Sequence, residues 1–295
     1  MTDMKTLKHS YNISSQEKSD PDWTAGLVDG HSCLFLSDVH YGNSGPETDL
    51  ELEKDLTSLT EYCIQHRIHP FLLGDIFDYW MEYPSGKRPA MGNRLLNRFH
   101  RYMQQTKPIL YITGNHDYWT RGYFKTLGFD IDHEYRELEL ADRRILLLHG
   151  DGLKDPQFHL PRPAFNRLLM HPLFVRLYQS LLPPPAGFAL MRWLSRFKRK
   201  FGTTDPRRLD TWAKEFLKKS DYDFVISGHD HTPRMETFSF GTYINTGAFY
   251  LHRTAVLYTN GQFRHVTWNR EHKKLKLTEG LDIKERQEDY HEQFS

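Results

Sequence analysis

The sequence predicts an α/β protein built on a mixed sheet or on two stacked sheets, with helices covering the sheet faces. Three observations predict this fold class. In the first half of the chain, short apolar runs alternate with amphipathic helical patterns. From residue 224 onward, strand-like runs follow one another with turns between them. Five of the apolar runs end in Asp, Asn or His beside Gly, which indicates a site at the carboxyl ends of the strands.

The individual elements follow from these patterns in chain order. Short uninterrupted apolar runs predict five buried strands, at residues 33–37, 71–73, 109–113, 144–148 and 224–227. Two helices are expected between the first three strands. The second spans 91–105, and the first carries on one face Leu52, Leu56, Leu59, Tyr62 and Cys63. Antiparallel strands joined by glycine-containing turns are expected at 234–240, 243–246, 254–258 and 263–268.

Composition and charge exclude several classes of protein. The chain has 295 residues, of which 38% are hydrophobic and 26% charged, so it is neither collagenous nor wholly disordered. Two cysteines, Cys33 and Cys63, are too few for a disulfide-stapled scaffold and favour a reducing compartment. A net charge of +1 gives no polycation that would bind nucleic acid without specificity. The 17 histidines leave metal chemistry open.

The chain divides into a leader, one domain and a tail. Residues 1–29 are polar, lack the apolar core of a signal peptide and predict a flexible leader. The domain is expected over 30–270, with a helical insertion at about 152–220. Residues 151–220 contain fourteen Lys and Arg but only five Asp and Glu, so the insertion is basic. Residues 271–295 predict a charged tail, as a frayed helix or a disordered segment. No run is long and apolar enough to predict a membrane span.

Five short polar motifs stand at the ends of the five buried strands. They are Asp38-Val39-His40, Gly74-Asp75-Ile76-Phe77-Asp78, Gly114-Asn115-His116-Asp117, His149-Gly150-Asp151 and Gly228-His229-Asp230-His231. Taken singly, each has an ordinary structural explanation as a turn or a core histidine. Five such motifs in succession, each after an apolar run, predict that their side chains lie close together in the folded protein. Carboxylates combined with imidazoles suit Mn²⁺, Fe or Zn²⁺ better than Ca²⁺.

Spacing within the motifs suggests which side chains act together. Residues two apart on a strand point the same way, so Asp38 and His40 can bind one ion together. One of His229 and His231 can also bind an ion. A pair of ions needs a shared ligand, and a carboxylate can bridge because it has two oxygens. Asp75 is the expected bridge.

These five motifs resemble those of the calcineurin-like metallophosphoesterases, whose pattern is D-x-H, G-D-x-x-D, G-N-H-D/E, an isolated H and G-H-x-H. The resemblance spans residues 38–231 and implies a four-layer α/β/β/α sandwich with a helical cap insertion and a dinuclear centre. It implies two divalent ions, of which manganese is expected and iron or zinc are alternatives. By the resemblance, one ion is held by Asp38, His40, Asp75 and His231. The other is held by Asp75, Asn115, His149 and His229.

The resemblance also assigns the catalytic residues. Paired divalent ions activate water and stabilise charge on phosphoryl oxygens. His116 stands where the family has a histidine that contacts the phosphate or protonates the leaving oxygen, and Asp78 stands where the family has its partner, which would fix the ring tautomer. The alternative for Asp78 is a carboxylate at a helix N-terminus.

The surroundings of the motifs resemble the UDP-2,3-diacylglucosamine diphosphatases of lipid A biosynthesis. The resemblance rests on 73–80, 149–153 and the basic insertion, which looks like a cap that receives two acyl chains. It implies hydrolysis of an acylated nucleotide sugar to UMP and 2,3-diacylglucosamine 1-phosphate. The expected substrate contacts are Asn115, Arg192, Ser195 and Arg196, and the two arginines can fork onto phosphate oxygens.

An acylated substrate also implies where the enzyme works. The segment 192–201 interleaves Trp and Phe with Arg and Lys and predicts peripheral contact with an anionic membrane surface. The expected location is cytoplasmic, on the inner face of the inner membrane. No nucleic-acid partner and no obligate protein partner are expected. A solvated basic helix packed on the core is the plainer interpretation of this segment.

One departure keeps other substrates open. A well-known branch of that diphosphatase family has Arg in the third motif, where this chain has His116. Histidine also fits a phosphomonoester or phosphodiester with a poorer leaving group, and a soluble nucleotide or a nucleic acid remains an alternative substrate. A non-catalytic scaffold is disfavoured because Asp75, Asn115 and His229 are all present.

Overall fold

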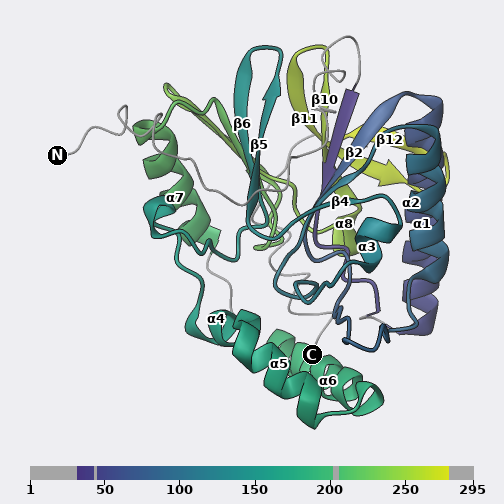
Figure 1. The fold of residues 1–295 in the computed structure, drawn as a ribbon. Coiled ribbons are helices and arrows are strands. Elements are labelled where there is room, and N and C mark those ends of the chain that lie inside the picture. Colours follow the sequence, from purple (N-terminus) through teal and green to yellow (C-terminus); the bar gives the residue numbers. More distant parts are fainter. Residues whose placement is uncertain (1–31, 43–44, 202–205, 279–295) are drawn as a thin grey trace.

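The computed structural model describes residues 32–42, 45–201 and 206–278 and shows two β-sheets stacked face to face between helices (Figure 1). The expected leader, residues 1–29, lies outside the described residues. The first sheet has the order β12 (Lys274–Leu277), β11 (Gln262–Asn269), β10 (Thr254–Thr259), β1 (Ser32–Leu36), β2 (Ile68–Leu73), β3 (Leu110–Ile112) and β4 (Asp130–Asp132). The second has the order β5 (Tyr135–Leu140), β6 (Arg143–Leu148), β7 (Phe224–Ser227), β9 (Gly241–Asn245) and β8 (Arg234–Phe238).

Alternating side chains on the central strands build the layers. On β1, Leu34 and Leu36 face the helices outside the sheet, whereas Cys33 and Phe35 face the second sheet. The same alternation on β6 sends Leu147 between the sheets and its neighbours outward. Strands that are buried on both faces require uninterrupted apolar sequence, which is why these runs are recognisable in the sequence.

Helices cover both outer faces of the stacked sheets. The first sheet is covered by α1 (Pro46–Gln65) and α2 (Asn93–Gln105), whose buried residues join one apolar cluster with those of β1 and β2. The second sheet is covered by α7 (Pro206–Lys219), through Leu209, Trp212 and Leu217. The result is the predicted four-layer order of helix, sheet, sheet and helix.

The structure departs from the sequence expectations at several elements. The expected antiparallel run is mixed, since β9 pairs in parallel with β7 and antiparallel with β8. Strand β5, with sequence YRELEL, was not expected because alternating charges mark it as an edge strand rather than a buried one. Strand β12 lies inside the segment expected to be a tail and extends the edge of the first sheet. Helix α7 lies inside the range expected for the insertion but packs on the second sheet.

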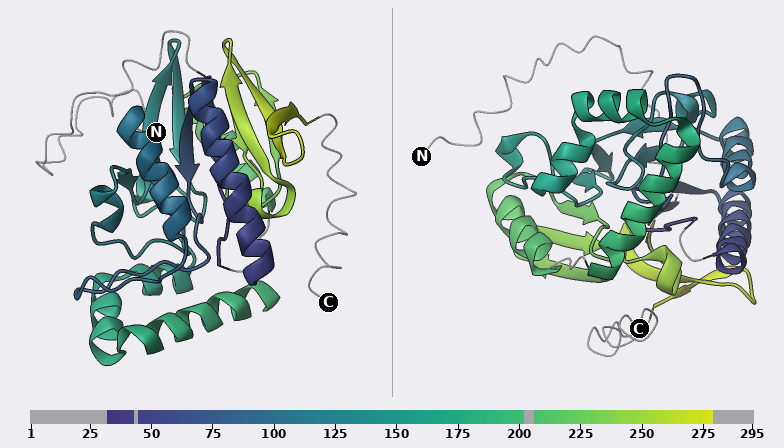
Figure 2. Two further views of the ribbon diagram at one scale, coloured as in Figure 1. Left: turned by 90° about the vertical axis from the view of Figure 1, so that its right-hand side faces the viewer. Right: turned by 90° about the horizontal axis from the view of Figure 1, so that it is seen from below.

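Three helices lie together across one end of the sandwich, and we call them the cap helices (Figure 1; Figure 2, left). They are α4 (Ala164–Met170), α5 (Pro172–Leu181) and α6 (Pro184–Phe201). The Tyr178 hydroxyl donates to Gly187 O at 2.7 Å and so joins α5 to α6. Hydrogen bonds also join the cap helices to the sandwich: Trp119 Nε1 donates to Leu169 O and Gln179 Nε2 donates to Glu82 O, both at 2.9 Å.

The remaining helices are short. They are α3 (Tyr123–Thr126), the 3₁₀ helix η3 (Pro156–Phe158) and α8 (Phe249–His252). Among the helices in the described ranges, none combines the length and apolar character needed to span a bilayer.

Candidate metal centre

Loops that follow five strands converge at the end of the sandwich that the cap helices face. Main-chain hydrogen bonds bring the loops together: Asp38 N donates to Gly74 O at 3.0 Å, and Gly228 N donates to His149 O at 2.9 Å. Gly74 is required at its position, because its φ is +86° and a Cβ there would collide with the His149 imidazole and lie 2.8 Å from Gly114 N.

Five of the residues predicted as metal ligands have left-handed backbone conformations. Their φ angles are 49° at Asp38, 46° at His40, 53° at Asp75, 76° at His229 and 64° at His231. This region is unfavourable for residues with a Cβ, although Asp and His tolerate it better than most. Such conformations persist where surrounding structure imposes them, and they concentrate at functional sites.

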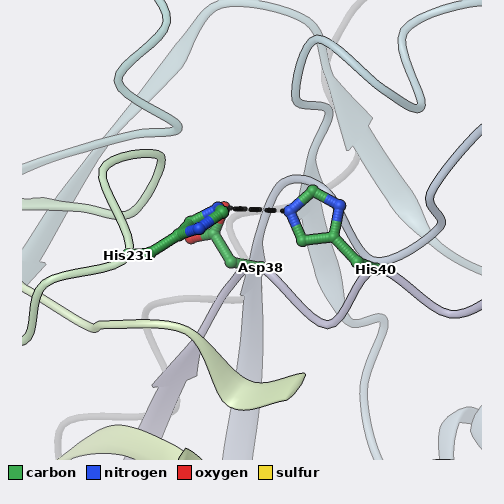
Figure 3. Close-up of side chains that lie close together, drawn as sticks. All are labelled: Asp38, His40 and His231. Atoms are coloured by element: carbon green, nitrogen blue, oxygen red, sulfur yellow. Dashed lines mark hydrogen bonds and ion pairs between the residues drawn. The ribbon is translucent and has the colours of Figure 1, made fainter. Parts of the chain in front are cut away.

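The first group of side chains consists of Asp38, His40 and His231 (Figure 3). His231 Nε2 lies 3.3 Å from Asp38 Oδ1, and His40 Nε2 lies 3.2 Å from His231 Nε2. One donor atom from each residue lies within 4.8 Å of the other two. Residues from the first and the last motif, far apart in the sequence, therefore form a single three-ligand cluster.

The second group consists of Asp75, His149 and His229, whose donor atoms also lie within 4.8 Å of one another. His149 Nε2 lies 3.4 Å from Asp75 Oδ2. The other ring nitrogen, Nδ1, donates to Leu73 O at 2.8 Å, which leaves Nε2 as the nitrogen that can bind a cation.

The carboxylate of Asp75 lies between the two groups. Its Oδ2 is 3.4 Å from His149 Nε2 and 3.8 Å from His40 Nε2, and its Oδ1 accepts a hydrogen bond from His116 N at 2.9 Å. This position suits the bridging role predicted from the sequence.

The donor atoms themselves fit divalent ions. The buried side-chain atoms without a hydrogen-bond partner in the described residues include three from the predicted ligands: Asp38 Oδ1, Asn115 Oδ1 and His149 Nε2. Buried polar atoms without partners cost free energy, and a coordinated cation would satisfy all three. Carboxylate oxygens, an amide oxygen and imidazole nitrogens together suit manganese, iron or zinc.

The pKa values of the side chains in the site show that their charges interact strongly. Burial opposes protonation of His40, but Asp38 and Asp78 raise its pKa to about 9. Burial also opposes protonation of His149, whose pKa Asp75 raises to about 10. For Asp38, burial raises the pKa, but His231 and His40 hold it well below its usual range. A protonated imidazole in this site carries positive charge that a bound cation would otherwise supply.

The predicted catalytic pair is arranged differently from the expectation. His116 Nδ1 lies 2.7 Å from the main-chain oxygen of Asp78, whereas the nearest carboxylate oxygen of Asp78 is 3.9 Å away. The main chain of Asp78 therefore fixes the tautomer and leaves Nε2 of His116 available. The Asp78 carboxylate lies 3.4 Å from His40 Nδ1 and accepts a hydrogen bond from Ser195. Asp78 precedes no helix, so the helix N-terminus alternative is wrong.

The predicted substrate contacts on α6 separate in the structure. Ser195 is buried, donates to Asp78 Oδ2 at 2.9 Å and lies 3.3 Å from His116 Nδ1, so it joins the cap helices to the catalytic pair. Arg192 is exposed on the same helix. The side chain of Arg196 lies outside what the structure describes.

Two positioning residues were missed by sequence reasoning. The buried carboxylate of Asp117 accepts hydrogen bonds from Tyr111 and from the main-chain N–H groups of Asp75, Ile76, Phe77 and Gly114. It joins the second motif to the third. Its place in the third motif was a signal, but the donors that it meets on another loop are visible only in the structure.

Asp230 is the second missed residue, and it lies between two predicted ligands. Its carboxylate accepts two hydrogen bonds from the buried Arg234, at 2.9 and 2.6 Å. Arg234 also donates to Asp210 on α7 at 2.6 Å. Helix α7 thereby fixes the loop that carries His229 and His231.

Comparison with known proteins identifies the family. A family model described as calcineurin-like phosphoesterase matches residues 31–233, which contain all five motifs and more than half of the chain. The chain belongs to this family. The protein is therefore a metal-dependent phosphoesterase, and the family implies divalent metal ions.

Several curated relatives share a name. A UDP-2,3-diacylglucosamine hydrolase of Porphyromonas gingivalis is 26% identical over 219 residues, which cover 67% of this chain and 82% of the relative. The protein of that name in Proteus mirabilis is 26% identical over 209 residues, covering 69% and 83%. At about one quarter identity, these relatives support the family and leave the substrate of this chain to be tested.

Solved structures of phosphoesterases are also similar. A predicted phosphoesterase from Streptococcus pneumoniae has 14% identity and a TM-score of 0.39, covering 86% of this chain and 95% of that chain. The phosphoesterase Yfce from E. coli has 16% identity and a TM-score of 0.41, covering 83% and 96%. At these values neither structure indicates a substrate.

The position of Asp75 predicts the effect of removing its charge. In Asp75→Asn, the carboxylate shared by both groups is lost while its shape is kept, so bound Mn²⁺ should fall by at least one ion per chain. Mn²⁺-dependent hydrolysis of an aryl phosphodiester should fall roughly 100-fold or more. Elemental analysis and initial rates measure both effects. Asp142→Asn, in an exposed turn, is the matched control. Full metal content in Asp75→Asn would contradict the bridging position.

The raised pKa values predict that metal binding releases protons. Both His40 and His149, with pKa values of about 9 and 10, carry a proton at pH 7.5 in the metal-free protein. Coordination requires neutral imidazoles, so Mn²⁺ binding at pH 7.5 should release about two protons per chain, and affinity should rise from pH 6 to pH 9. Calorimetry in buffers of different ionisation enthalpy counts the protons. Binding without proton release would show that these imidazoles are already neutral at pH 7.5 in the metal-free protein.

Proposed function

We propose that this phosphoesterase hydrolyses the diphosphate of UDP-2,3-diacylglucosamine to give UMP and 2,3-diacylglucosamine 1-phosphate. The observation that carries the proposal is a cavity between the cap helices and the sandwich that has both polar and apolar walls. Asn115, His116 and Asn166 are its polar lining residues, and the others are apolar: Trp80, Trp119, Leu169, Met170 and Met191. The cavity itself has a volume of only about 20 Å³, and a neighbouring pocket of about 370 Å³, which shares Trp119 and Met170 with it, gives room for a larger part of such a substrate.

The names of the curated relatives support the same substrate. The proteins of Porphyromonas gingivalis and Proteus mirabilis are both named UDP-2,3-diacylglucosamine hydrolase. Their similarity covers more than four fifths of their own length, so it includes most of each relative.

We assign two divalent ions to the two groups of ligands. One ion would be held by Asp38, His40, Asp75 and His231, and the other by Asp75, Asn115, His149 and His229. When bound, such a pair supplies Lewis-acid stabilisation of phosphoryl oxygens and acidifies water. Manganese is the ion we propose, because the donor set mixes oxygen with nitrogen.

His116 acts on the phosphate through Nε2. Because Asp78 O holds Nδ1, the ring has a fixed orientation and Nε2 remains for the substrate. Nε2 lies 4.0 Å from Asp75 Oδ2, beside the bridging position. A phosphate leaving group needs little protonation, so His116 mainly holds the diphosphate, and with poorer leaving groups it also donates a proton.

The cap helices carry an apolar surface that fits a membrane. On α5, Leu173, Leu177 and Leu181 follow one another at intervals of four residues and are 66%, 58% and 70% exposed. They form one stripe along the helix, which we call the leucine stripe. On α6, Trp193 is 58% exposed beside Arg192. Exposed apolar side chains with neighbouring cations are typical of peripheral contact with an anionic bilayer.

A lipid substrate requires this contact, since acyl chains stay in the bilayer. We propose that the enzyme works on the cytoplasmic face of the inner membrane, with the cap helices toward the lipid. No nucleic-acid partner and no obligate protein partner are part of the proposal.

Product analysis tests the substrate directly. Purified protein with Mn²⁺ and detergent-dispersed UDP-2,3-diacylglucosamine should release UMP and the 1-phosphate lipid, and Asp75→Asn should release neither at a comparable rate. Mass spectrometry of both products measures the reaction. Absence of UMP, together with hydrolysis of soluble nucleotides or simple phosphodiesters, would replace this substrate with the alternative class.

The variant His116→Ala distinguishes binding of the diphosphate by His116 from proton donation to the leaving group. Turnover of UDP-2,3-diacylglucosamine should fall about 100-fold with metal content unchanged, and turnover of an alkyl phosphodiester should fall further because its leaving oxygen needs a proton. Rates for both substrates and elemental analysis measure this. Equal rates in the variant and the wild type would remove His116 from the mechanism.

The leucine stripe predicts weaker membrane binding when it is made polar. The double variant Leu173→Ser and Leu177→Ser should bind phosphatidylglycerol vesicles at least about tenfold more weakly, because each leucine loses its transfer free energy. Leu50→Ser is the control, since Leu50 is also exposed (41%) but lies on α1. Sedimentation with vesicles measures binding. Unchanged binding in the double variant would show that the stripe faces water.

A further inference from the structure

We propose that a second pocket, between α5 and the segment after the third motif, binds the nucleotide half of the substrate through Arg121 and Arg176. The pocket has a volume of about 370 Å³, within the range of small-molecule sites. This inference rests on the proposed function and adds to it the site that recognises the nucleoside phosphate.

The pocket adjoins the reaction centre. Trp119 and Met170 line both this pocket and the cavity that contains Asn115 and His116, so the two spaces share a wall. Trp119 is fixed there, because its Nε1 donates to Leu169 O at 2.9 Å. A substrate whose diphosphate lies at Asn115 and His116 can therefore extend one end into the second pocket.

The two spaces differ in size, which decides which of them can hold a nucleotide. The cavity at His116 has a volume of about 20 Å³, enough for a group the size of a water molecule. The second pocket has two arginines in its wall, together with Thr120, Gln179 and Ser180. A nucleoside phosphate offers anionic oxygens and ribose hydroxyls, which match guanidinium and hydroxyl groups.

The arginines have capacity for an anion. Within the ranges that the structure describes, the guanidinium groups of Arg121 and Arg176 form no ion pair, and the lining contains no acidic residue. The nearby Glu82 is already engaged: its carboxylate accepts from Trp80 Nε1 at 3.0 Å and from the main-chain N–H groups of Arg121 and Tyr123 at 2.7 and 3.1 Å. Two unpaired cations at one pocket favour a phosphate-bearing ligand.

An aromatic wall completes the pocket. Tyr118 is half-buried in the lining, with its ring centroid 5.1 Å from that of His133. His133 is held at both ring nitrogens, with Thr113 Oγ1 at 3.0 Å and Thr120 Oγ1 at 3.3 Å. Flat rings held in place suit stacking with a nucleobase.

A phospholipid headgroup has the same phosphate chemistry, and Arg176 stands beside Leu177 of the leucine stripe. The nucleotide is favoured because the aromatic and hydroxyl lining matches a base and a ribose, which a phosphatidylglycerol headgroup lacks. The two sources are separated by titration with UMP and with phosphatidylglycerol vesicles.

Calorimetric titration of the Mn²⁺-loaded full-length protein with UMP tests the proposal. Arg121→Ala and Arg176→Ala should each weaken UMP binding at least about tenfold, and Arg→Lys at the same positions should restore part of it, because lysine keeps the charge but not the fork. Arg101→Ala is the matched control, an exposed arginine on α2 outside both cavities. Vesicle binding by the same variants should stay within about twofold of the wild type.

Two results would overturn the proposal. One is UMP affinity that is undetectable in the wild type or unchanged in both alanine variants. The other is loss of phosphatidylglycerol binding with UMP affinity intact, which would assign the arginines to a lipid headgroup. The proposed function is tested separately by product formation. If the protein releases UMP from the lipid substrate but the alanine variants bind UMP as the wild type does, only the pocket assignment is contradicted. If UMP binding depends on the arginines but the lipid substrate is not hydrolysed, only the proposed reaction is contradicted.

Discussion

Buried charge at the ends of the strands is the constraint on which the rest of the structure depends. Asp38 and Asp75 are almost fully buried, and each is paired with imidazoles. An ionised carboxylate in the protein interior costs several kcal/mol unless a positive charge compensates it. The divalent ions that the family implies would supply that charge and would also satisfy acceptors such as Asn115 Oδ1. The groups that need a cation for stability are the same groups that we propose as its ligands.

Much of the surrounding fold serves to hold these groups in place. Asp117 collects main-chain N–H groups from two loops, and Arg234 connects the last loop to α7. The left-handed conformations at Asp38, His40 and Asp75 are unfavourable locally and are maintained by such bonds. Helices that cover the sheets therefore contribute to ligand geometry as well as to the core.

The fold was predictable where burial leaves a pattern in the sequence. Strands such as β1 and β7 are buried on both faces and read as apolar runs. The edge strand β5 alternates charged with apolar residues and gave no such run. The direction of β9 beside β7, and the attachment of α7 to the second sheet, depend on which surfaces meet in space. No local pattern carries that information.

The sequence by itself predicted which side chains gather at the ends of the strands, because their motifs, with glycines beside them, follow buried apolar runs. Only the tertiary structure decided how they are oriented. It shows that the main chain of Asp78 holds His116, that Ser195 reaches the pair from α6, and that Trp119 lies in the wall shared by two cavities. These contacts join residues up to 117 positions apart. Hydrogen bonds and shared walls depend on distances between atoms, and the order of residues along the chain does not specify those distances.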